Sequence, residues 1–226
     1  PLRICMNSAM PQPGSKKSLN DLLIKGPSAL ADLMSVNLGF RENVFALTKD
    51  LSKFYQCVEA DPTAQHLRRV VWRWGQETEE PEVYITTTVN FGDRPAGCIA
   101  ITAVRATAEK YEEICPEAAW FIRNRTYVDD ATAGADMREE LEAISSGMEA
   151  IVEKGGFKFK ETVKSGDKLK DAVHLPKILG LRWDTERDRL LLEIKVNFAG
   201  KHKGANLEPD ADLDNVEASL PGVVTK

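Results

Sequence analysis

The chain is poor in the residues that build metal–thiolate and hydrolase sites. Its 226 residues include three histidines and four cysteines, all widely spaced, and no Cys-x-x-Cys pair occurs. This spacing argues against structural zinc and against a disulfide framework, so we expect a protein of a reducing compartment. No Gly-x-Ser-x-Gly sequence accompanies the histidines, and a serine hydrolase triad therefore has no support.

Long hydrophobic runs are also lacking. No apolar run approaches the length of about eighteen residues that a membrane span needs, and no charged segment followed by an apolar one opens the chain. Hydrophobic residues make up 42% and charged residues 29%, the composition of an ordinary globular protein with one sizeable core or two small ones. The chain starts at Pro1 without Met, and we expect it to be a piece of a longer protein.

An excess of positive charge is absent from the chain as a whole. The net charge of -5 argues mildly against avid nucleic-acid binding. Residues 151–203 nevertheless hold thirteen Lys and Arg against eight Asp and Glu, and residues 208–217 are acidic. A basic stripe before an acidic connector fits polyanion binding, although solvated lysines would give the same pattern.

The order of apolar, β-rich and turn-forming segments predicts an α+β fold, in which helices back an antiparallel sheet. The expected helices are residues 28–40 with Ser28 as cap, a short one opened by Asp61 and Pro62, residues 95–113, and residues 137–153 ending at Gly155. The expected strands are residues 2–6, 44–48, an antiparallel pair at 70–74 and 83–89, residues 157–160, and a hairpin of 177–183 with 190–198.

Three aspartates are placed where strands end or turn. Asp50 follows the apolar run 44–48, and Asp129 and Asp130 precede the small residues 131–134, which allow a tight turn. Because side chains alternate along a strand, adjacent aspartates approach one centre only at a strand end or turn. If the two segments are neighbouring strands, the carboxylates converge, repel one another and bind a hard divalent cation, above all Mg²⁺. A solvated Asp-Asp turn is the ordinary alternative.

Eight stretches resemble, in the same order along the chain, the reverse transcriptase of BEL/Pao long-terminal-repeat retrotransposons. The most telling are the Tyr-Val-Asp-Asp sequence at 127–130 and Asp50 with the aromatic Tyr55 five residues later. A Tyr-Val-Asp-Asp alone is a weak signal, whereas eight collinear stretches are a strong one. They are residues 1–4, 18–23 with 25–27, 40–41, 50–56, 91–96, 127–130, 155–157 and 179–183.

The resemblance implies a right-hand polymerase palm with partial fingers. Residues 1–43 would form the partial fingers and the transition to the palm, and residues 44–175 the palm with the catalytic aspartates. Residues 176–226 would form a primer-grip-like hairpin and a connector toward a thumb. Outer fingers, a complete thumb and the other domains of a polyprotein are not matched, so the chain would be a polymerase core.

The resemblance also implies a role for individual residues. Asp50, Asp129 and Asp130 would be catalytic and would hold two Mg²⁺ ions, or Mn²⁺ in their place, together with the carbonyl of Leu51. A lysine that serves as general acid on pyrophosphate often follows the Gly-Gly stretch, and Lys160, beside Glu161, matches it best. The implied nucleotide-binding residues are Arg3 on the triphosphate, Tyr55 as the steric gate under the sugar, Phe91, Gly92 and Lys160. The implied primer grip is Leu179, Gly180, Leu181, Arg182 and Trp183.

Each of these assignments has a structural alternative. Arg3 could be a surface arginine, Tyr55 a core aromatic, Phe91 with Gly92 a plain turn before a helix, and residues 179–183 an apolar hairpin that packs. The stretch after Gly92 also departs from the family, since many members carry a serine pair and a proline there and this chain has Asp93, Arg94 and Pro95.

The function implied is an RNA-directed DNA polymerase, a nucleotidyltransferase. Its partners would be an RNA or DNA template with its primer, dNTPs and the other domains of the parent polyprotein, in a cytoplasmic retroelement particle and with no membrane. One alternative is a catalytically silent, retroelement-derived binding or assembly module, and another is a palm-type nucleotidyltransferase such as a cyclase. An intact set of Asp50, Asp129 and Asp130 favours the enzyme.

Overall fold

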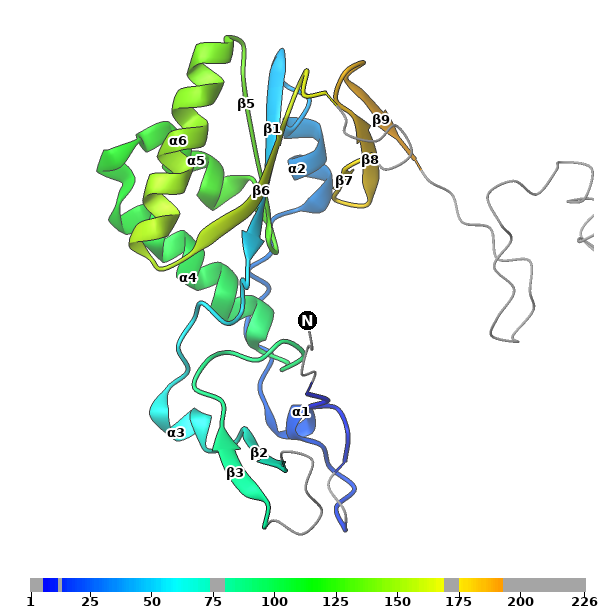
Figure 1. Ribbon diagram of the computed structural model, residues 1–226, viewed down its shortest axis with the longest axis vertical. Helices are drawn as coiled ribbons and strands as arrows, with labels where there is room; N and C mark the ends of the chain where they lie inside the picture. The colour runs from blue at the N-terminus through cyan, green and yellow to red at the C-terminus, as the bar shows by residue number, and fades with distance from the viewer. Residues whose placement is uncertain (1–5, 12–13, 74–79, 169–174, 193–226) are drawn as a thin grey trace, which may run out of the picture. The chain divides into compact units, whose positions relative to one another are not determined.

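The computed structural model describes residues 6–11, 14–73, 80–168 and 175–192 (Figure 1). The chain divides into the units Pro1–Leu190 and Leu191–Lys226, and the candidate site lies in the first. None of the helices in the described ranges is long and apolar enough to span a membrane. Of the expected strand 2–6, only Met6 is among the described residues. Positions 193–198 and the acidic segment 208–217 lie wholly outside them.

A four-stranded antiparallel sheet in the order β4-β5-β1-β6 is the centre of the first unit. Three helices, α4, α5 and α6, pack against one of its faces (Figure 1). This arrangement confirms the prediction of an α+β fold with an antiparallel sheet backed by helices. The strands are β4 (Thr126–Tyr127), β5 (Asp130–Ala135), β1 (Phe45–Ser52) and β6 (Lys158–Lys164), and the helices are α4 (Ala96–Lys110), α5 (Pro116–Asn124) and α6 (Arg138–Lys154).

The remaining elements are short. Asp61 caps α3 with Pro62 at its start, as expected, and the β2–β3 pair is antiparallel. The predicted helix 28–40 begins later than expected, because Asp32 and not Ser28 accepts the Ser35 N–H at its start. These elements are α1 (Leu19–Leu22), α2 (Leu33–Gly39), α3 (Pro62–Gln65), β2 (Arg69–Trp72), β3 (Glu82–Ile85), η1 (Glu112–Ile114), β7 (Lys177–Ile178), β8 (Leu181–Asp184) and β9 (Arg189–Leu191).

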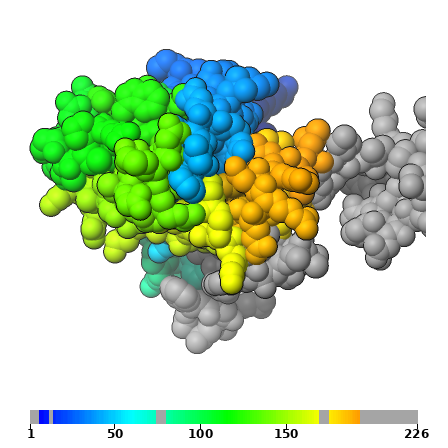
Figure 2. Space-filling view, turned by 90° about the horizontal axis from the view of Figure 1, so that it is seen from above, coloured from blue at the N-terminus to red at the C-terminus, as the bar shows by residue number. Residues whose placement is uncertain are grey.

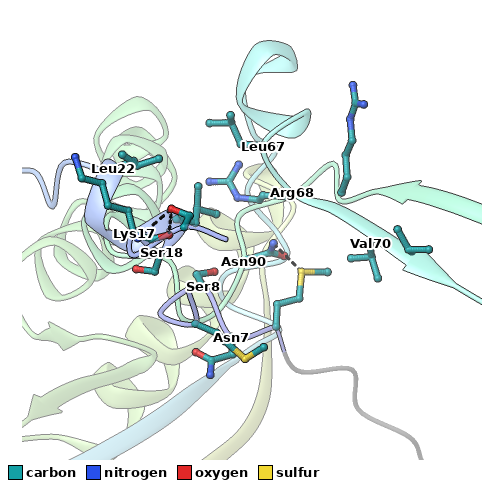
Figure 3. Close-up of a pocket in the computed structure, with 15 residues that line it drawn as sticks. Asn7, Ser8, Lys17, Ser18, Leu22, Leu67, Arg68, Val70 and Asn90 are labelled. Atoms are coloured by element: carbon teal, nitrogen blue, oxygen red, sulfur yellow. Dashed lines mark hydrogen bonds between the residues drawn. The ribbon is translucent and has the colours of Figure 1, made fainter. Parts of the chain in front are cut away.

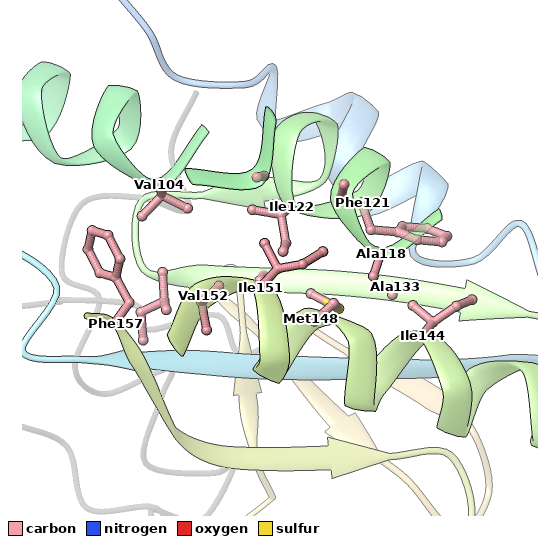
Figure 4. Close-up of a cluster of buried hydrophobic side chains, with 14 of the residues drawn as sticks. Val104, Ala118, Phe121, Ile122, Ala133, Ile144, Met148, Ile151, Val152 and Phe157 are labelled. Carbon is pink, nitrogen blue, oxygen red and sulfur yellow. The ribbon is translucent and has the colours of Figure 1, made fainter. Parts of the chain in front are cut away.

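The larger hydrophobic core lies between the sheet and the three helices. Figure 4 shows Ile144, Met148 and Ile151 of α6 facing the strand that carries Ala133. The alanines of β5 allow this close packing, since a small side chain lets a helix approach the sheet. Residues 131–134, expected to form a turn, are therefore a buried strand, and the turn precedes them.

Alternation along β1 separates the two faces of the sheet. Leu47 and Leu51 belong to the core under the helices, whereas Ala46 belongs to a second cluster with Phe40 and Trp183. Asp50 has the same parity as Ala46 and therefore points away from the helices. The helices thus supply the core, and the opposite face of the sheet is left to carry the carboxylate.

Candidate active site

The β4–β5 hairpin closes on a two-residue turn. Tyr127 pairs with Asp130, which leaves Val128 and Asp129 at the tip. Val128 has φ 56°, a left-handed conformation that costs free energy for a β-branched residue, and this is the position where a type II′ turn requires positive φ. The N–H of Leu51 donates to the Asp129 carbonyl at 2.8 Å and so ties the strained tip to β1.

Asp50 and Asp130 are direct cross-strand partners in the antiparallel β1–β5 pair. Directly opposed residues present their side chains on the same face, with Cβ atoms about 5 Å apart. The sequence predicted that Asp50 would lie at the end of its strand. This is wrong, because β1 continues to Ser52. The structure therefore brings Asp50 and Asp130 together, with Asp129 on the adjoining turn.

The charges of the three aspartates interact. The pKa of Asp130 is raised to about 6, first by burial and then by the negative charges of Asp129 and Asp50. Burial likewise raises the pKa of Asp129, and the charge of Asp50 adds to this effect. Carboxylate oxygens that repel one another in a half-buried site are the donor set that suits a hard divalent cation. The three carboxylates are not gathered around one point, however, since among the described residues no group of three or more His, Cys, Asp or Glu side chains is arranged to hold one metal ion.

The raised pKa of Asp130 predicts a pH-dependent stability. Because the folded state favours the protonated acid, this contribution to stability is complete below about pH 4 and is lost as the pH rises through about 6. Asp130→Asn should therefore stabilise the chain at pH 7.5 by about 1–2 kcal/mol, a figure reduced because the side chain is only half-buried. Urea unfolding with EDTA at pH 4 and pH 7.5 measures the difference, which should disappear at the lower pH. Glu113→Gln, which removes a carboxylate at an exposed position, is the control variant.

A β-bulge directs Lys160 toward the aspartates. In the β1–β6 pair Asp50 faces Glu161 and Leu51 faces Phe159, so Lys160 is the extra, unpaired residue. Its positive charge lowers the pKa of Asp129, against the larger raising effect of burial. The structure thus places Lys160 near the turn and puts Glu161 directly across from Asp50.

Tyr55 and Phe91 lie beside this cluster. The Tyr55 ring is half-buried, and its pKa is raised by burial and by the charge of Asp129. It makes edge contacts with Phe54 at 5.0 Å and with Phe91 at 5.7 Å between centroids. Phe91 is 66% exposed, and Gly92 after it has φ 97°, which favours glycine. The two rings therefore form an aromatic corner next to Asp129.

The residues expected to form the primer grip, 179–183, lie in two different surroundings. Leu179 and Gly180, both at positive φ, form the turn between β7 and β8, and the Leu179 backbone lowers the pKa of Asp130, against the larger raising effect of burial. Trp183 is fully buried, packs edge-on against Phe40 at 4.9 Å and donates to Asp188. Trp183 is thus a core residue, as in the packing alternative, whereas Leu179 belongs to the aspartate cluster. Leu181 and Arg182 are half-buried on β8.

Of two further expected positions, Arg3 and Leu51, the structure describes only Leu51. Arg3 lies outside the described residues, and Leu51 contributes the backbone N–H to the hairpin tip while its side chain is buried. Lys49, which was not predicted, is fully buried on the other face of β1. Its Nζ lies 2.5 Å from Oε1 of Glu149 and 2.9 Å from Oγ1 of Thr162. The available signal was its place in the alternation, because Lys49 has the same parity as the apolar Phe45, Leu47 and Leu51.

Comparison with known proteins gives distant structural likenesses among solved structures. No family model matches the chain, and no curated protein does. A solved structure of a foamy viral protease-reverse transcriptase in complex with double-stranded DNA is similar, with 15% sequence identity and a TM-score of 0.48. The match covers 63% of this chain and 22% of the viral one, so this chain spans about a fifth of the length of that neighbour.

Proposed function

We propose that the chain is the palm, with partial fingers, of an RNA-directed DNA polymerase that adds dNTPs to a primer 3′-hydroxyl. The observation that supports this most is the cross-strand pair of Asp50 and Asp130, with Asp129 on the strained turn between β4 and β5. Eight collinear stretches further support a polymerase of the BEL/Pao type. The division into residues 1–43, 44–175 and 176–226 belongs to the same proposal, as do a nucleic-acid partner and the other domains of a polyprotein.

The residues on the aspartate face would hold and orient the reactants. The carboxylates of Asp50, Asp129 and Asp130, with the Leu51 carbonyl, are the groups that would hold Mg²⁺. Bound divalent ions would activate the 3′-hydroxyl and neutralise the leaving pyrophosphate. Phosphoryl transfer needs little covalent help, so the rigid hairpin tip would act by positioning. Lys160, whose charge acts on Asp129, would give a proton to the pyrophosphate.

The aromatic corner would select the sugar. The Tyr55 ring packs against Phe91 and is close to Asp129, and beneath a bound nucleotide it would leave no room for a 2′-hydroxyl. We expect Tyr55→Ala to lower the preference for dNTP over rNTP, as the ratio of kcat/KM values, by about ten- to a hundredfold. Tyr55→Phe keeps the ring and should keep the preference. An unchanged ratio in the alanine variant would assign Tyr55 to core packing alone.

A silent binding module is the second candidate. It is favoured by the lack, among the described side chains, of three acidic groups in one arrangement suited to an ion. Thermal unfolding with and without Mg²⁺ distinguishes the two. The enzyme should be stabilised by the ion and should lose this response in Asp50→Asn, whereas a silent module should show no shift in either chain.

Primer extension on an RNA template tests the proposal directly. The native chain should incorporate dNTPs with Mg²⁺ or with Mn²⁺, while Asp50→Asn serves as the inactive reference. If the native chain is silent, the assay should be repeated with the flanking segments of the parent protein restored. Continued silence there would contradict the polymerase function.

A further inference from the structure

The turn that carries Phe91 is anchored to the rest of the protein through the buried carboxylate of Asp93. Asp93 has a side chain that is 0% exposed, and its Oδ2 lies 2.5 Å from Nε of Arg68, itself 5% exposed. The Ser8 hydroxyl donates to the other oxygen at 2.6 Å. Arg68 also donates to the Ala64 carbonyl at 3.1 Å. Both oxygens of Asp93 are thus engaged by segments more than twenty residues away along the chain.

A second tether reaches the same turn from α1. The Asn20 side-chain amide donates to the Gly92 carbonyl at 2.9 Å and accepts the Arg94 N–H at 2.8 Å. The Arg94 guanidinium returns a hydrogen bond to the Asn20 carbonyl at 3.3 Å. A capping box between Ser18 and Asp21 fixes the start of α1 and hence the position of Asn20.

The back of the turn borders a pocket of about 690 Å³, lined by Ser8, Arg68 and Asn90 among others (Figure 3). On its other side the turn carries Phe91, whose ring contacts the ring of Tyr55. Arg68 therefore lies between the pocket and the turn, and its guanidinium pairs with Asp93 and is shielded from solvent. Because a guanidinium is planar and always charged, its pairing with a carboxylate in a buried site favours a single arrangement of the two side chains.

We propose that Arg68, Asp93 and Asn20 are positioning residues that set the affinity for the incoming nucleotide by fixing the turn at residues 91–94 against Tyr55. This inference rests on the proposed polymerase function. A small misplacement of a contact surface can cost a large factor in binding or rate, so a turn tethered at both ends has a kinetic consequence. The tethers use Asp93 and Arg94, the two residues that replace the serine pair of many BEL/Pao sequences.

Steady-state incorporation kinetics test the proposal in Asn20→Ala, which leaves no buried charge unpaired. The KM for dNTP should rise about three- to tenfold, the effect of one or two net hydrogen bonds, with kcat changed less than about twofold. Ser8→Ala should act in the same direction. Arg123→Met breaks a partly exposed ion pair with Glu112 and should change neither constant. An unchanged KM in a folded Asn20→Ala chain would overturn the proposal.

Amide hydrogen exchange provides a readout that does not need activity. The Arg94 N–H, bonded to the Asn20 side chain, should exchange about tenfold faster in Asn20→Ala, with α6 amides unaffected. If primer extension is absent both in the native chain and with the flanking segments restored, but this change appears, the polymerase function fails and the tether stands. If the Arg94 amide exchanges at the native rate, the tether fails whatever the activity.

Discussion

Primer extension is expected to fall by at least about a thousandfold when Asp129 and Asp130 are both replaced by asparagine, which is the upper end of what losing one preorganised electrostatic group costs. The reason is geometric. Asp130 stands directly across from Asp50, and Asp129 lies on the turn that Leu51 ties to β1. Asparagine keeps the shape of each side chain but removes the negative charge that would hold the divalent ions.

The loss of activity should not come from unfolding. Burial raises the pKa of Asp129 and Asp130, so their ionised forms destabilise the fold at neutral pH. The double variant should therefore be at least as stable as the native chain in urea unfolding at pH 7.5. Glu112→Gln with Glu113→Gln, which also removes two adjacent carboxylates, is the matched control and should extend primers normally. An equal loss in the control would point to a general effect of charge.

Arg68→Met is expected to lower the free energy of unfolding by about 3–5 kcal/mol, because it leaves a buried carboxylate without its cation. Asp93 has no exposed side-chain surface, and the Ser8 hydroxyl alone would remain to satisfy it. Combining Arg68→Met with Asp93→Leu removes both charges and should recover most of the loss, since an apolar pair of similar volume can replace a buried ion pair.

Urea denaturation of the single and double variants measures this coupling. Arg123→Met is the comparison, because its ion pair with Glu112 is 3.3 Å long and partly exposed. Its loss should be about 1 kcal/mol or less. Similar losses in Arg68→Met and Arg123→Met would show that the Arg68 pair adds no more than a surface contact.

Local sequence signals predicted several elements well. The helix ending at Gly155, the short helix opened by Asp61 and the β2–β3 pair depend on capping residues and on β-rich runs that act over a few residues. Helix α5 was not predicted, although Pro116 starts it and Phe121 and Ile122 lie on its apolar face. Its nine residues are too few to give a clear period, and packing against α4, α6 and β5 stabilises them.

By itself, the sequence determined the fold class, most of the local elements and the set of acidic residues, because turn chemistry and hydrophobic alternation are written into short stretches. Only the tertiary structure decided the register that opposes Asp50 to Asp130 and the bulge that turns Lys160 toward Asp129. The same holds for the pairing of Arg68 with Asp93, which are 25 residues apart. These features depend on how distant segments align, and a one-residue slip in a strand would move every side chain to the opposite face.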